Sequence, residues 1–186
     1  MQLQEITKEP DLIKKCQNGD SAAFADLIYP HKENLITYLS RLSGNQTTAE
    51  DLFQETLVKV WNGIKKYKEQ NKFSSWLFSI AHNVALDSYR KMKHEKYNIT
   101  VEEVADLSSN DNPHSVYVSK EMQNQFEKAI TVLSKKQKEV FLLRMHGNMP
   151  FKEIAKLTGE PINTVLGHMH YAVKKLKSML RNENVN

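Results

Sequence analysis

Apolar residues recur along this chain every three or four positions, which is the spacing of one face of an α-helix. No alternating apolar and polar run between turn residues predicts a β-strand. A first helix is expected over residues 11–17, and Asp20 can cap the next helix until Pro30 interrupts it. A third helix is expected where apolar residues recur from Leu35 to Leu42, and it should end at Gly44. The pattern predicts an all-α protein.

Two longer stripes complete the first half of the chain. Thr47 and Glu50 have the spacing of a capping box, and the helix behind them should run to about Tyr67. A charged link over residues 68–72 leads into a further helix that ends near Tyr97. The residues predicted to face the core of this part are Leu52, Phe53, Leu57, Val60, Trp61 and Ile64, then Phe73, Leu77, Ile80, Val84 and, near the edge, Trp76.

Residues 98–113 differ in composition from both sides of the chain. They carry four acidic side chains and no Lys or Arg, whereas basic clusters end the preceding segment and begin the following one. A stretch rich in Ser, Asn and Asp is typical of a flexible linker. We therefore expect a helical domain over residues 1–97, an acidic linker over 98–118, and a second helical domain over 119–186.

The second domain contains the spacing of a helix-turn-helix. Ser134 and Gln137 form a capping-box pattern before an apolar helix, and residues 151–175 hold two helices around Gly159. Pro161 suits the first turn of the second of these helices. In such motifs the second helix enters a DNA major groove.

Charge and cysteine content narrow the function classes. The net charge of +4 and the pI near 9.0 are compatible with a polyanionic partner but do not require one. The single cysteine, Cys16, excludes an intrachain disulfide and is expected as a small buried residue rather than a reactive thiol. Neither a run of about 18 apolar residues nor a signal-peptide pattern occurs, so a cytoplasmic protein without membrane insertion is expected.

Two outward faces are candidates for function. On the helix after Thr48, the face opposite the core-facing residues is acidic. The simplest interpretation of this face is an ordinary solvent-exposed surface. On the next helix, aromatic, amide and basic residues share a face, as suits unstacked bases and a phosphate backbone. Packing of Phe78 and Leu86 within the same domain is an equally good interpretation. The residues of these faces are Asp51, Gln54, Glu55, Val58 and Asn62, then Phe78, His82, Asn83, Leu86, Tyr89, Arg90 and Lys93.

The chain resembles a known family. Residues 48–61 and 72–91, with the opening helices at 11–31, are similar to the region-two domain of bacterial RNA polymerase sigma factors of the extracytoplasmic-function type. Residues 129–176 resemble the region-four domain of the same factors. The resemblance implies a subunit that is not an enzyme, needs no cofactor or metal, and binds core RNA polymerase and promoter DNA. An anti-sigma factor is the usual regulator in this family.

The resemblance also implies three sets of contact residues. Core polymerase would be bound by Asp51, Gln54, Glu55 and Val58. The downstream (minus-ten) promoter element, with flipped bases, would be held by Lys68, Lys72, Phe78, His82, Asn83, Asp87 and Arg90. The upstream (minus-thirty-five) element would be bound by Lys152, Asn163, Thr164, Leu166, Gly167, His168, His170, Tyr171, Lys174 and Lys175. Acidic linker residues such as Glu102, Glu103 and Asp106 would imitate nucleic acid near the polymerase active site.

Several positions depart from the pattern of the family. Lys or Arg is usual at the positions of Leu166, His168 and Tyr171, and phosphate contacts supply much of the affinity of a DNA-binding helix. A small apolar residue is usual at Glu160, and Arg at His82. Binding to the upstream element is therefore expected to be weaker or to be shifted onto the lysines 152, 156, 174 and 175.

Two other function classes compete with this interpretation. A nucleic-acid-processing enzyme would need a metal or phosphate site, but His168 and His170 point to different sides of a helix and no Gly-rich phosphate loop occurs. A helix-turn-helix regulator that does not bind core polymerase is the main alternative. Binding to core polymerase separates the two.

Overall fold

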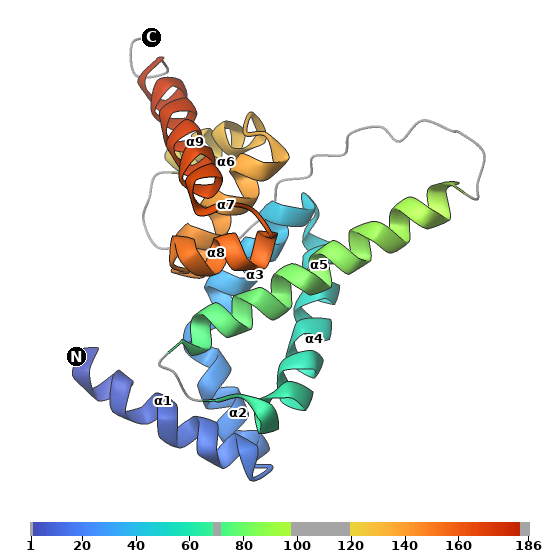
Figure 1. The fold of residues 1–186 in the computed structure, drawn as a ribbon, viewed down its shortest axis with the longest axis vertical. Helices are drawn as coiled ribbons and strands as arrows, with labels where there is room; N and C mark the ends of the chain where they lie inside the picture. The colour runs from blue at the N-terminus through green and yellow to red at the C-terminus, as the bar shows by residue number, and fades with distance from the viewer. Residues whose placement is uncertain (1, 69–71, 98–119, 183–186) are drawn as a thin grey trace. The chain divides into compact units, whose positions relative to one another are not determined.

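The computed structural model describes residues 2–68, 72–97 and 120–182 (Figure 1). Within these ranges the chain is helical with short connections and has no strand, which confirms the all-α prediction. It divides into two compact units, residues 1–106 and 107–186. The predicted linker, residues 98–118 with its acidic residues 102, 103 and 106, lies outside the described residues, and the boundaries at 97 and 119 stay predictions.

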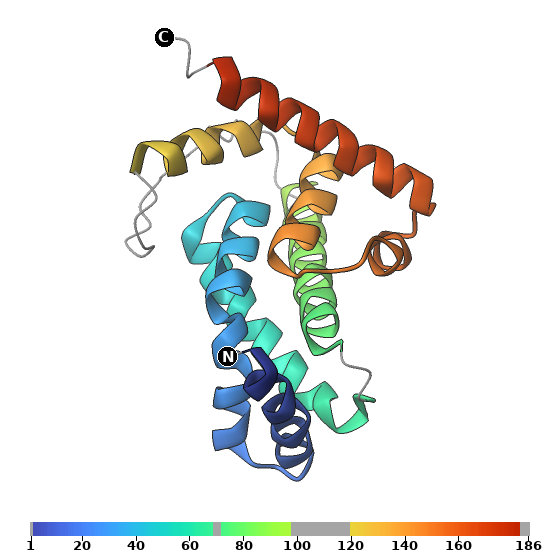
Figure 2. The same cartoon turned by 90° about the vertical axis from the view of Figure 1, so that its left-hand side faces the viewer.

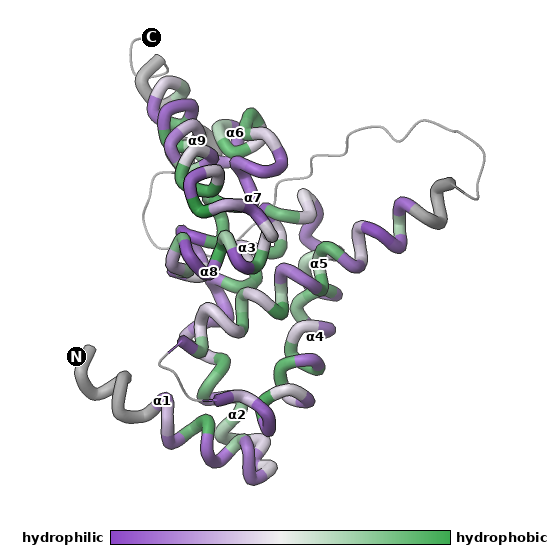
Figure 3. Tube along the Cα trace, in the orientation of Figure 1, coloured by the Kyte–Doolittle hydropathy of each residue, from purple (hydrophilic) through white to green (hydrophobic). Residues whose placement is uncertain are grey.

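The first unit begins with a longer helix than expected. Its elements are α1 (Gln2–Gln17), α2 (Ser21–Ile28), the 3-10 turn η1 (Tyr29–His31), α3 (Lys32–Ser43), α4 (Gln46–Gly63), the 3-10 turn η2 (Ile64–Lys66) and α5 (Phe73–Tyr97). Apolar and polar positions alternate along each helix at the helical period, so that each has one face for the core (Figure 3). The helices α3, α4 and α5 pack against one another, and α1 packs against α2.

Two predicted helix starts had different outcomes. The carboxylate of Asp20 accepts hydrogen bonds from the backbone N–H groups of Ala22 and Ala23, at 2.9 and 3.0 Å, which confirms the predicted cap of α2. The capping box at Thr47 is wrong. Gly44 ends α3 in the left-handed conformation (φ 75°), and the next residue, Asn45, caps α4 by accepting from the Thr48 N–H at 3.0 Å.

Cys16 belongs to the core of the first unit, as expected. Its side chain is fully buried beside other apolar residues of the unit. Burial, and then the negative charge of Asp20, raise the pKa of the Cys16 thiol, which disfavours the reactive thiolate.

The second unit contains α6 (Lys120–Thr131), α7 (Lys135–His146), α8 (Phe151–Thr158) and α9 (Ile162–Asn182). The long helix α9 packs across α6, α7 and α8 (Figure 2). Gly159, in the left-handed conformation (φ 71°), forms the turn between α8 and α9, as the helix-turn-helix pattern predicts. The core residues of this unit are Ala129, Ile130, Leu133, Val140, Phe141, Leu142, Leu143, Met149, Ile154, Val165, Ala172 and Leu176.

The start of α7 confirms the second predicted capping box. The Ser134 hydroxyl accepts from the N–H of Gln137 at 3.4 Å, and the Gln137 side-chain oxygen accepts from the N–H of Ser134 at 3.2 Å. Two of the free backbone N–H groups at this helix end are thereby satisfied. This start fixes Lys135 and Lys136 in the first turn of α7, next to the helix-turn-helix.

Candidate protein and nucleic-acid interfaces

The outward face of α4 is acidic and exposed, as predicted. Its polar side chains and Val58, which is 59% exposed, lie in solvent. Glu55 pairs with Lys59 at 3.1 Å, and the same Lys59 nitrogen lies 4.0 Å from Asp87 on α5. Asp51 and Gln54 remain on the exposed face beside this pair. The arrangement offers carboxylates and one apolar side chain to a basic partner.

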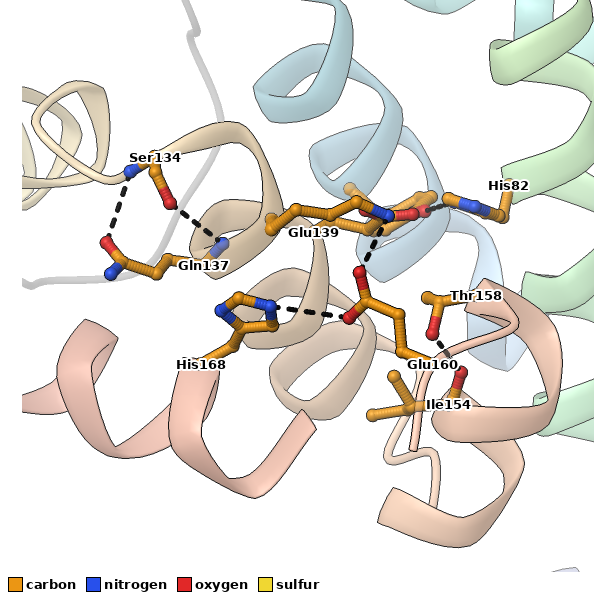
Figure 4. A network of polar contacts seen from close by, with 10 residues as sticks. His82, Ser134, Gln137, Glu139, Ile154, Thr158, Glu160 and His168 are labelled. Carbon is orange, nitrogen blue, oxygen red and sulfur yellow. Dashed lines mark hydrogen bonds and ion pairs between the residues drawn. The ribbon is translucent and has the colours of Figure 1, made fainter. Parts of the chain in front are cut away.

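The α5 face differs from the prediction at two residues. Phe78 is fully buried, with its ring in a T-shaped contact with Tyr38 at 5.4 Å. His82 is 4% exposed, and its Nδ1 atom lies 3.0 Å from the Tyr38 hydroxyl (Figure 4). The prediction that Phe78 and His82 face outward is therefore wrong, and the alternative, packing of Phe78 within the domain, is correct. The cause is that α5 packs against both α3 and α4, which widens its buried face.

The remaining α5 residues form a smaller polar surface. Asn83, Tyr89, Arg90 and Lys93 are exposed, and Arg90 donates to the Asp87 carboxylate at 3.1 Å. Tyr89 is 52% exposed, so an aromatic ring is still available on this side of α5. The surface thus keeps an amide, a ring and two cations, which suit bases and phosphates.

The basic link between α4 and α5 is anchored at its described ends. Gln17, from α1, donates through Nε2 to the carbonyl oxygens of Ile64 and Tyr67, at 3.2 and 2.9 Å. The rings of Tyr67, Phe73 and Trp76 contact one another, with centroids 4.7 to 5.9 Å apart. The exposed lysines held by this anchor are Lys65, Lys66, Lys68 and Lys72; residues 69–71 lie outside the described residues.

Local sequence patterns do not predict this anchor. Gln17 lies 47 and 50 positions from its partners, so no local pattern connects them. Gly63 gives a weak signal, because a Cβ atom at this position would lie 3.2 Å from the Trp76 ring. A glycine just before a run of lysines is the only sequence sign that a ring packs against this helix end.

The second helix of the helix-turn-helix, α9, presents most of its predicted contact residues to solvent. Asn163, Thr164, Leu166, His170, Tyr171, Lys174 and Lys175 are exposed, as is Lys152 on α8. Gly167 is half-buried. Lys175 donates to the backbone carbonyl of Val132 at 3.3 Å, so it also ties α9 to the turn after α6.

His168 lies against the turn of the helix-turn-helix (Figure 4). Its Nε2 atom is 3.3 Å from Oε2 of Glu160, although no hydrogen bond of good geometry reaches that buried oxygen from the described residues. Oε1 of Glu160 lies 3.2 Å from the Lys136 ammonium, which is also 3.4 Å from the Glu139 carboxylate. The two departures at positions 160 and 168 are thus in contact with each other.

Lys136 connects the two carboxylates of this network. Burial opposes its charge, but the attraction of Glu139 and Glu160 outweighs burial and raises the pKa of Lys136. The ammonium group therefore stays charged at neutral pH and holds Glu160 in the turn. The other oxygen of Glu160 then lies 3.3 Å from His168, on the side of α9 that faces the protein.

Metal ligation and membrane insertion find no support in the described part of the chain. No group of three or more His, Cys, Asp or Glu side chains in the described ranges is placed to hold a metal ion. None of the helices in these ranges is both long and apolar enough to cross a membrane.

Comparison with known proteins identifies the family. Sigma-70 region 2 matches residues 27–95, and Sigma-70, region 4 matches residues 123–176. The ECF RNA polymerase sigma factor SigW of Bacillus subtilis is 29% identical over 177 residues, covering 91% of this chain and 95% of SigW. The RNA polymerase sigma factor YlaC of the same organism is 27% identical over 154 residues, covering 82% of this chain and 88% of YlaC.

A solved structure supports the same assignment. The sigma factor RpoE from Bartonella quintana, in complex with the anti-sigma factor NepR, has a TM-score of 0.68 and 27% identity, covering 85% of this chain and 96% of that chain. The family regions follow one another in the order that the sequence predicted, one in each unit. This chain therefore belongs to the sigma-70 family and is an RNA polymerase sigma factor of the extracytoplasmic-function type, not an enzyme.

Proposed function

We propose that this alternative sigma factor divides promoter-specific initiation among three exposed surfaces. The acidic face of α4 binds core RNA polymerase, the basic link and α5 hold the melted minus-ten strand, and α9 enters the major groove of the minus-thirty-five element. The observation that carries the proposal is the match of regions two and four, in that order, to the two helical units. Such a subunit acts in the cytoplasm, where core polymerase and the chromosome are.

The polymerase-binding surface consists of Asp51, Gln54, Glu55 and Val58. All four are exposed along one side of α4, so no rearrangement of the core is needed to reach them. Carboxylates around an apolar side chain suit a partner with basic residues around an apolar pocket. Lys59, paired with Glu55, limits the negative charge at one edge and so helps to set the register of the partner.

The minus-ten surface consists of Asn83, Asp87 and Arg90 on α5 with Lys68 and Lys72 of the link. Lysines and Arg90 neutralise phosphates, which gives affinity, whereas Asn83 carries both a donor and an acceptor for a base edge. The exposed Tyr89 ring adds a surface on which a base can stack. Phe78 and His82 support this surface from the core instead of touching DNA, because both are buried.

The minus-thirty-five surface lies on α9, with Lys152 of α8. Asn163, in the first turn of α9, has the groups that pair with an adenine edge in the major groove. Lys174 follows farther along the exposed side and suits a phosphate. An anti-sigma factor, such as the NepR that binds the related RpoE, fits the proposal as an occupant that blocks these surfaces.

Reconstitution with core polymerase tests the proposal. The full chain, added to core enzyme, is expected to co-purify with it and to direct transcription from a subset of a randomised promoter library. Transcripts should share an upstream and a downstream element with a fixed spacing. DNA binding without association to core polymerase would instead support a helix-turn-helix regulator.

The lysines of α9 give a prediction about salt. Replacing Lys174 with Ala should reduce the slope of log affinity against log salt for duplex promoter DNA by about 0.9, the effect of one missing phosphate contact. The measurement is a salt titration of holoenzyme on promoter fragments. Lys128→Ala, which removes the same charge from the exposed side of α6, is the control and should leave the slope unchanged. An equal slope for wild type and Lys174→Ala would place Lys174 away from the DNA backbone.

A further inference from the structure

Gly167 is a glycine that the fold itself does not explain. It lies inside α9, where glycine destabilises a helix by about 1 kcal/mol relative to alanine. A Cβ atom at this position would meet nothing within 4 Å, and its φ is not positive, unlike those of Gly19, Gly44 and Gly159. Neither close packing within the unit nor an unusual backbone conformation therefore requires glycine here.

Gly167 lies on the side of α9 that faces away from the core of the unit. Val165 and Ala172 are fully buried and mark the side of α9 that faces the core. At 100° per residue, Gly167 falls on the opposite side, next to Asn163 and His170, both of which are exposed. The space that a missing side chain leaves is thus open to a ligand of the recognition helix.

Exposed apolar side chains lie on the flank of α9 that borders Asn163, since Asn163 and Leu166 are three residues apart. Ile162 and Leu166 are one turn apart, and they are 45% and 43% exposed. Scattered exposed apolar residues are ordinary. These two, however, lie in the first half of the proposed recognition helix, which also contains Gly167, whereas the exposed lysines of α9 lie farther along at positions 174, 175 and 177. The first half of α9 contains no Lys, Arg, Asp or Glu, and the half with the lysines follows it.

We infer that Leu166 and Gly167 form a thymine-contacting patch that determines which upstream elements are bound. Gly167 lets the backbone of α9 lie directly on the edge of a base pair, and Leu166 then contacts the C5-methyl group of thymine. A·T and T·A pairs display that apolar methyl group in the major groove, whereas G·C and C·G pairs do not. Asn163, on the same side, suits the adenine of an A·T pair. This inference rests on the proposed function of α9, and it specifies that α9 prefers thymine at the contacted position.

The variant Gly167→Ala separates this role from a structural one. Alanine should raise the midpoint of thermal unfolding of the full chain by about 2 °C, because it favours the helix. It should nevertheless weaken binding of holoenzyme to its selected promoter by about tenfold, since a methyl group then holds α9 off the bases. A structural glycine would give the opposite result, a loss of stability with unchanged affinity.

Uracil substitution tests the methyl contact directly, because uracil differs from thymine only in lacking the C5-methyl group. Each thymine of the upstream element is replaced in turn, and holoenzyme binding is measured. Wild type should bind about fivefold more weakly at one or two positions. Leu166→Ala should bind the thymine and uracil forms equally at those positions. Met145→Ala, which truncates an exposed apolar side chain of α7, should retain the wild-type preference.

The outcomes distinguish the inference from the function on which it rests. Equal binding of thymine and uracil DNA by wild type, or full affinity of Gly167→Ala, would overturn the thymine-contacting patch while leaving the role of α9 in place. Holoenzyme whose affinity is independent of the upstream element would overturn the role of α9 itself.

Discussion

Reversing two charges on α4, in the variant Asp51→Lys with Glu55→Lys, is expected to abolish binding to core RNA polymerase. Both carboxylates are exposed, and the variant replaces two negative charges with two positive ones on a surface proposed to meet basic residues. Like charges across an interface cost several kcal/mol, so we expect at least about a hundredfold weaker binding. The first unit should stay folded, because the surface pair of Glu55 with Lys59, which the variant breaks, contributes only about 0.5 kcal/mol.

A matched variant makes this result interpretable. Asp26→Lys with Glu33→Lys changes the net charge by the same amount, at exposed positions of α2 and α3. The measurement is co-purification and affinity with core enzyme, together with circular dichroism of each variant. The control should bind like wild type. Undiminished binding of the α4 variant would show that the acidic face is an ordinary solvated surface.

Replacing Asn83 and Arg90 with alanine should impair promoter melting far more than assembly of the holoenzyme. The variant removes an amide suited to a base edge and a cation suited to a phosphate, both on the exposed side of α5. It also leaves Asp87 without the guanidinium that lies 3.1 Å away, so a carboxylate then faces the DNA backbone. Open complexes should fall by about tenfold or more, since each interaction with a base or phosphate is worth about 1 to 3 kcal/mol.

Permanganate footprinting at equal holoenzyme occupancy measures this effect, because the reagent oxidises unpaired thymines. Lys32→Ala with Asn34→Ala, at exposed positions of α3, removes the same kinds of group away from α5 and should leave the footprint intact. A bubble signal equal to that of wild type in the α5 variant would remove this helix from the minus-ten surface.

Local sequence patterns predicted the helix ends correctly wherever a single residue or capping pair determines the end. Asp20, Ser134 with Gln137, and Gly159 each act through neighbours within three residues or through their own backbone, so spacing alone located them. The start of α4 failed because two residue types competed. Asn45 follows the left-handed Gly44 and caps the helix, so α4 begins at Gln46 and Thr47 already lies inside its first turn.

The sequence predicted the candidate site less well where tertiary packing determines which side chains are exposed. A helix that packs against two neighbours buries a wider face than a helix that packs against one, and hydrophobic periodicity does not show how wide that face is. Phe78 and His82 therefore looked exposed although both lie in the core around Tyr38. In the same way, positions 160 and 168 looked like two separate departures, whereas Glu160 and His168 face each other.

The Glu160 pairing has a consequence for exchanging promoter specificity between related factors. A graft that transplants only α9 would bring His168 next to whatever residue precedes the helix in the recipient. Without a carboxylate held by Lys136, that imidazole would lose the acidic side chain that lies 3.3 Å from its Nε2 atom in the turn. The portable segment is therefore the turn and helix together, from Glu160 onward, and Lys136 must be present in the recipient scaffold. Chimeras built with this junction should inherit the donor's promoter preference intact, whereas those cut at Ile162 should acquire a hybrid one.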